Sequence, residues 1–98
     1  MEIYFEDEYL ADLYEGKAKG KPKYQSTLIK AYIKTISKLR ASVSLEDIKQ
    51  FRSLNFEKLI NTDLYSVRVN DKYRIEFKIE KKEIVILGII RLSNHYER

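Results

Sequence analysis

The chain has 98 residues, which is enough for one compact domain over residues 1–98 and too few for a second. A hydrophobic fraction of 44% argues against a disordered chain, and the absence of cysteine excludes disulfides and thiolate metal sites. The net charge of +4 is unevenly distributed, because residues 1–16 carry −6 and therefore leave +10 for the rest of the chain.

The acidic first segment predicts a short strand followed by a short helix. Met1–Phe5 alternates briefly, and the apolar side chains of Glu8–Glu15 recur at helical spacing. An export leader begins with basic residues, so an acidic start predicts that no leader is present. The longest apolar stretch, Ile84–Ile90, is too short to cross a bilayer. We therefore expect a soluble, cytoplasmic protein that does not contact a membrane.

A loop and a longer helix follow. Two glycines and a proline interrupt residues 16–22, which predicts a loop. Over Gln25–Ala41 the apolar positions recur every three or four residues, which predicts an amphipathic helix. Lysines spaced by four form a basic ridge beside the apolar stripe of this helix, and we assign RNA binding to it: Lys30, Lys34 and Lys38.

The charge of this region is one-sided. Between Lys17 and Arg40 there are eight basic residues and no acidic one. The usual partners of such a cationic field are nucleic acid and anionic membrane, and plain solubility is the alternative explanation. Charge alone does not choose between a specific partner and solubility.

The middle of the chain contains one more helix signal. Ser44 and Asp47 form a capping box, which predicts a second short helix through Ile48 and Phe51. The last third of the chain is rich in alternating strand patterns. The sequence therefore predicts an α+β fold, with an N-terminal strand and two helices packed on a small antiparallel β-sheet.

Two alternating segments, 65–69 and 73–79, predict a hairpin whose register can be derived. A two-residue turn would pair apolar with charged residues, because a shift of one residue turns a strand over. A three-residue turn over 70–72 pairs Val69 with Tyr73, and the apolar residues then share one face. This register also places Arg68 directly opposite Arg74.

Like charges opposed on a sheet are unfavourable, so the arginine pair requires an explanation. Either both guanidinium groups splay into water, or they converge on a phosphate. After the last apolar stretch, which is predicted to be a central strand covered on both faces, come Asn94, His95 and Tyr96. His95 is the single histidine and titrates near neutrality, so it is a candidate acid or base.

Four stretches together resemble the HigB-type branch of the RelE/ParE toxin superfamily, the plasmid-maintenance killer proteins. They are Phe56-Glu-Lys-Leu, Leu64-Tyr-Ser-Val-Arg-Val-Asn70, Tyr73-Arg-Ile-Glu-Phe77 and the tail Asn94-His-Tyr. The order of elements matches as well. Members of the family often end in Asp-Tyr-His, whereas this chain lacks the acid and exchanges the order of His and Tyr.

The resemblance implies an RNA endonuclease that enters the ribosomal A site and cleaves mRNA without a metal or cofactor. In that chemistry Arg68 and Arg74 would hold the scissile phosphate, and Lys58 falls where such toxins carry a functional lysine. His95 would be the acid or base, and Tyr96 would share that role or stack on a base. For Lys58, an exposed salt-bridging role is the alternative.

The resemblance also implies partners. The first partner is mRNA in the A site of the 30S subunit, and the second is a cognate helix-turn-helix antitoxin of the HigA type. Operator DNA would be contacted only through this antitoxin. The acidic residues 2–15 would either dock the antitoxin or balance the basic body.

Two other functions remain open at this point. A ParE-like inhibitor of DNA gyrase would have the same fold, and fold alone does not fix function. A non-catalytic RNA-binding or ribosome-binding protein would fit the charge equally well. Metal, redox and glycine-rich phosphate-loop chemistries have no support in the sequence.

Overall fold

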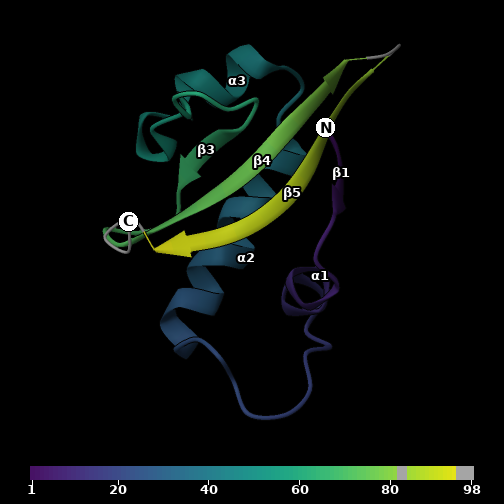
Figure 1. Ribbon diagram of the computed structural model, residues 1–98, viewed down its shortest axis with the longest axis vertical. Helices are drawn as coiled ribbons and strands as arrows, with labels where there is room; N and C mark the ends of the chain where they lie inside the picture. Colours follow the sequence, from purple (N-terminus) through teal and green to yellow (C-terminus); the bar gives the residue numbers. More distant parts are fainter. Residues whose placement is uncertain (82–83, 95–98) are drawn as a thin grey trace.

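The computed structural model describes residues 1–81 and 84–94 (Figure 1). Three α-helices and one 3₁₀ turn lie between the first strand and the C-terminal strands: α1 (Glu8–Glu15), α2 (Ser26–Ala41), α3 (Leu45–Gln50) and η1 (Arg52–Leu54). The predicted bounds of α1 and α2 are confirmed almost to the residue, because both helices carry a clear apolar period. Ser44 Oγ accepts a hydrogen bond from the backbone N–H of Asp47, which confirms the predicted cap of α3.

The strands form one five-stranded sheet in the order β1-β5-β4-β3-β2. Their bounds are β1 (Glu2–Phe5), β2 (Glu57–Lys58), β3 (Tyr65–Arg68), β4 (Tyr73–Lys81) and β5 (Val85–Asn94). The sheet was expected to be antiparallel, but β1 pairs in parallel with β5. A parallel pair needs a long crossover, and here the crossover is nearly the whole chain. The α+β class itself is confirmed, with three α-helices where the fold prediction named two.

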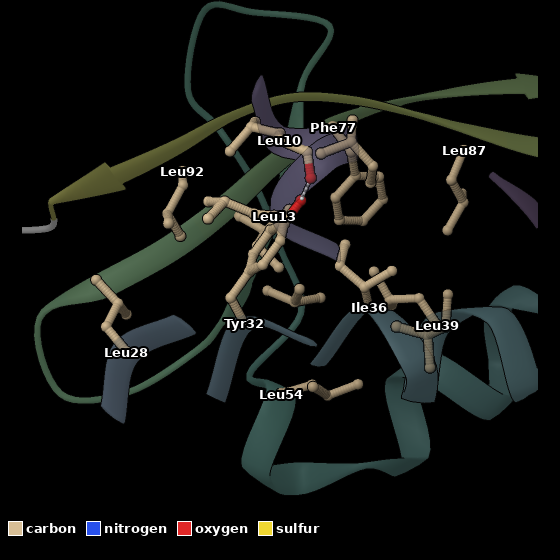
Figure 2. Close-up of a cluster of buried hydrophobic side chains, with 14 residues drawn as sticks. Leu10, Leu13, Leu28, Tyr32, Ile36, Leu39, Leu54, Phe77, Leu87 and Leu92 are labelled. Carbon is tan, nitrogen blue, oxygen red and sulfur yellow. Dashed lines mark hydrogen bonds between the residues drawn. The ribbon is translucent and has the colours of Figure 1, made fainter. Parts of the chain in front are cut away.

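The hydrophobic core lies between one face of the sheet and the helices, and we call this the inner face. Figure 1 shows α2 crossing behind β4 and β5. Figure 2 shows Tyr32 of α2 at the centre of the core, where its hydroxyl donates to the carbonyl of Leu10 at 2.7 Å. Burial raises the pKa of Tyr32, so this hydroxyl stays protonated and remains a donor. The bond ties α1 to α2 inside the core.

The opposite face, which we call the outer face, carries the other set of alternating side chains. β5 is an interior strand, as expected, but in the described residues no helix covers its outer face. At Gly88 the outer face of β5 is covered by a side chain instead. The Cζ and hydroxyl oxygen of Tyr4 both lie only 2.6 Å from the position that a Cβ of residue 88 would occupy. Lys78 Nζ lies 2.8 Å from a carboxylate oxygen of Glu6. Hydrogen bonds with Glu6 and then with Tyr4 raise the pKa of Lys78.

The close approach of Tyr4 makes Gly88 sensitive to substitution. We expect Gly88→Ala to destabilise the protein by about 1–3 kcal/mol, because the added methyl group displaces the Tyr4 ring from β5. The measurement is the midpoint of urea unfolding. In a Tyr4→Ala background the same methyl meets no ring, so the cost should largely disappear. An equal cost in both backgrounds would contradict this explanation.

Candidate active site on the outer face of the sheet

Three adjacent strands bring residues from distant parts of the sequence into one row on the outer face. Arg68 of β3 pairs with Arg74 of β4, and Arg74 pairs with Ser93 of β5. The predicted hairpin register is therefore confirmed, including the three-residue turn. Asn94, the last residue of β5, pairs with Tyr73. The two tail residues assigned to catalysis, His95 and Tyr96, lie outside the described residues.

The sequence predicts two possible arrangements for Arg74, extension into water or convergence with Arg68 on a phosphate. Its side chain adopts neither of them. Its side chain is only 7% exposed and turns toward β3 instead of toward solvent. Nε donates to Ser66 Oγ at 2.8 Å, and Nη2 donates to the carbonyl of Asn55 at 2.6 Å. A buried cation requires such partners to offset its desolvation. The guanidinium therefore fastens the segment before β2 onto the sheet, and in this structure it does not form a phosphate fork with Arg68.

Arg68 remains accessible at the rim of the row. Its side chain is 45% exposed, and it forms an ion pair with Asp71 in the hairpin turn. Nε also donates to the carbonyl of Asn70 at 3.1 Å. An exposed pair of this kind contributes little stability, and its guanidinium can exchange Asp71 for another anion at low cost. Arg68 is thus the member of the arginine pair that an incoming phosphate can reach.

The short strand β2 places a carboxylate at the site instead of a lysine. Glu57 pairs with Ser66, and Lys58 pairs with Tyr65, whose side chain belongs to the inner face. Partners in an antiparallel pair share a face, so Glu57 lies on the outer face. Its side chain is 50% exposed, with Oε2 3.8 Å from Nη2 of Arg74. Glu57 carries no recognisable signal in the sequence, because a strand of two residues shows no period.

Lys58 lies beside this carboxylate at the edge of the sheet. Its Nζ donates to the carbonyl of Thr62 in the following loop. A hollow of about 340 Å³ opens here, lined by Glu57, Lys58, Leu59, Ile60, Thr62 and Glu76. Lys58 thus stands at the rim of a hollow that holds two carboxylates, and it is not in the row with Arg68 and Arg74.

Farther along the outer face the charges are largely paired. Arg91 Nε lies 3.4 Å from an oxygen of Glu76, whose side chain is mostly buried. Together with Lys78 and Glu6, this pair gives the middle of the outer face alternating signs. Near the β3–β4 turn and β2, Arg68 and Glu57 are each about half exposed.

The predicted basic ridge lies on another side of the molecule. The buried residues of α2 pack toward the inner face, and Lys30 and Lys34 are exposed on the side of the helix away from the sheet. Lys38 is half-buried, with Nζ 6.0 Å from the ring centroid of Phe51. Because the sheet lies between this ridge and the outer face, the structure does not bring these lysines together with the arginines.

The described groups can perform proton transfer and bind an anion. Glu57 is a half-exposed carboxylate, and Arg68 is a cation that can be reached from solvent. In residues 1–81 and 84–94 there is no group of three or more His, Cys, Asp or Glu side chains that could hold a metal ion. Within the same ranges, no helix is long and apolar enough to cross a membrane.

Comparisons with known proteins agree with one another on the fold. The family model described as a RelE-like toxin of the type II toxin–antitoxin system HigB matches residues 3–89, a range that includes Glu57 and both arginines and ends before the Asn94-His95-Tyr96 tail. Among solved structures, a YoeB/ParE toxin from Agrobacterium tumefaciens is similar, with a TM-score of 0.56 and 16% identity over 98% of this chain and 100% of that one. No curated protein matches the chain.

Proposed function

Because the chain belongs to the HigB-like family of RelE-like type II toxins, we propose that it is an endonuclease that cleaves mRNA on the ribosome. Ribosome-dependent mRNA cleavage is the general activity of the family. The observation that carries the proposal is the position of Glu57, a half-exposed carboxylate beside the Arg68–Arg74–Ser93 row. A carboxylate can accept a proton from the attacking hydroxyl, and neighbouring cations can stabilise the negative charge of the phosphodiester.

The proposed reaction is a transesterification within the RNA. The 2′-oxygen attacks the adjacent phosphorus and forms a cyclic phosphate, while the bond from phosphorus to the 5′-oxygen of the next nucleotide breaks. Glu57 accepts the 2′-hydroxyl proton, and an acid returns a proton to the leaving oxygen. No metal or other cofactor enters this scheme.

The other side chains take distinct roles in the proposal. Arg68, which solvent reaches, stabilises the phosphate charge, and Lys58 adds positive charge at the rim of the hollow. Arg74 is a positioning residue, because its bonds to Ser66 and Asn55 hold the segment that presents Glu57. His95 is the proposed acid, and Tyr96 shares that role or stacks on a base.

Membership of a type II system implies an antitoxin partner. We propose that the antitoxin is a small helix-turn-helix protein, and that operator DNA is contacted only through it. The toxin would act in the cytoplasm, where its mRNA substrate is translated. The reading frame beside the gene for this chain should encode such a protein.

The decisive test adds purified protein to a translating system and maps the 5′ ends of the mRNA. The expected result is a set of cuts within codons that appears only when ribosomes are present. Expression in cells should arrest growth, and replacing Arg74 or His95 should relieve the arrest. Intact mRNA in an assay where the protein inhibits gyrase supercoiling would support the ParE-like function instead. Intact mRNA with active gyrase would favour a non-catalytic RNA-binding protein.

A further inference from the structure

The loop between α1 and α2 contains the densest group of cations in the chain. Four lysines occupy alternating positions of this segment, and all four are exposed: Lys17, Lys19, Lys21 and Lys23. We call residues 17–23 the lysine loop. Lys17 Nζ lies 3.5 Å from a carboxylate oxygen of Glu15, and on the C-terminal side of the loop no acidic residue occurs before Glu46. The intervening residues are glycine, alanine and proline, which offer no large apolar side chain for a protein partner or a bilayer.

Both ends of the lysine loop are fastened to the body of the protein. At the start, the backbone N–H of Lys17 donates to the carbonyl of Asp12 at 2.8 Å. At the end, the backbone N–H of Lys23 donates to the hydroxyl of Tyr9, and Lys23 Nζ lies 4.5 Å from the centroid of that ring. The backbone of the loop is therefore fixed at both ends, unlike that of a free tail.

An aromatic series on the inner-face side connects the lysine loop to the end of the sheet whose outer face carries the candidate active site. Tyr24, directly after the loop, lies between Tyr9 and Tyr73, with ring centroids 6.4 Å and 6.0 Å away. Tyr73 is the first residue of β4, precedes Arg74, and pairs with Asn94 at the end of β5. Figure 1 shows the loop running from α1 to the start of α2 at one end of the molecule. The loop thus flanks the end of the sheet where the site is built.

We propose that the lysine loop is a second RNA contact, which grips the phosphate backbone of the RNA whose scissile bond lies at the outer-face site. Lysine ammonium groups are point charges that bind phosphates without reading bases, so this contact adds affinity and does not select codons. The inference rests on the proposed function, because it assigns RNA as the partner. It also moves RNA binding away from the ridge of α2, which faces another side of the molecule.

The two lysine sets offer a matched comparison. The loop variant is Lys17→Gln, Lys19→Gln and Lys21→Gln, and the ridge variant is Lys30→Gln, Lys34→Gln and Lys38→Gln. Each removes three positive charges. Lys23 is kept because it contacts Tyr9. The urea unfolding midpoint of each variant is measured first, and neither is expected to change much because the exchanged groups lie at or near the surface.

The probe is a single-stranded RNA with 2′-O-methyl groups, which lacks the attacking hydroxyl and reports binding without cleavage. Affinity is measured over a series of salt concentrations. The loop variant should reduce the slope of log affinity against log salt by roughly 2, since each lost phosphate contact contributes about 0.7. The ridge variant should leave the slope nearly unchanged.

Three outcomes would overturn the inference. They are an unchanged slope in the loop variant, equal losses in both variants, and a loop variant that keeps RNA binding but loses binding to phosphatidylserine vesicles. Because the probe cannot be cut, this result is independent of the cleavage assay. A protein that cuts no mRNA but shows the expected difference between variants would refute the endonuclease and retain the RNA contact.

Discussion

Replacing Glu57 with Gln should reduce mRNA cleavage by about 10²- to 10⁴-fold, because the amide cannot accept the 2′-hydroxyl proton. The side chain is half-exposed and its distance to Arg74 is long for an ion pair, so the fold should tolerate the change. The measurement is the rate of cleavage in a translating system at saturating ribosomes, with the urea midpoint recorded for the same preparation.

Glu76→Gln is the matched control for this substitution. Glu76 lies on the same outer face, at the same register level as Glu57, and lines the same hollow, but its carboxylate is paired with Arg91 and is mostly buried. We expect its cleavage rate to stay within about 10-fold of the original, below the usual contribution of a general base. A Glu57→Gln protein that cuts as fast as the Glu76→Gln protein would remove Glu57 from the mechanism.

Replacing Arg74 with Met should destabilise the protein by about 3–5 kcal/mol, the usual cost of removing one member of a buried charged network. The substitution leaves the carbonyl of Asn55 without its donor and releases the segment before β2. A domain of this size has a total stability of roughly 5–15 kcal/mol, so the loss would be a large part of it. The measurement is the free energy of unfolding in urea.

Arg68→Met provides the matched control, since Arg68 is the register partner of Arg74 and carries the same charge. Its guanidinium is partly exposed, so its removal should change the unfolding free energy by no more than about 1 kcal/mol while lowering cleavage. The two arginines would thus separate, one acting mainly through stability and the other mainly through phosphate binding. Equal losses of stability would contradict the assignment of Arg74 as a positioning residue.

Much of the fold could be predicted from the sequence because the core residues obey strict periods. The apolar stripe of α2 and the alternation of β3 and β4 each allowed only one arrangement that kept charge out of the core, and the register followed. The parallel pairing of β1 with β5 could not be predicted in this way. Alternation shows which side of a strand is apolar, but it does not show which strand lies beside it.

The candidate site was less accessible to prediction, for two physical reasons. Alternation correctly placed Arg74 away from the core, but it carried no information about Asn55 and Glu57, which fold across the edge of the sheet and bury the guanidinium. In β2 an offset of a single residue decides whether a carboxylate or an ammonium group reaches the outer face. The family resemblance indicated Lys58 as the functional residue, whereas the structure places its neighbour Glu57 on the outer face beside Arg74.

The pairing of β1 with β5 also has a consequence for biosynthesis. Ile3 and Phe5 of β1 pack against the core only after their register partners in β5, Leu87 and Ile89, are available. Almost the entire chain lies between β1 and β5 in the sequence. Long-range closure of this kind slows folding. A nascent polypeptide therefore cannot complete its sheet until β5 has emerged from the exit tunnel, so the row of Arg68, Arg74 and Ser93 is assembled only after β5 has been synthesised.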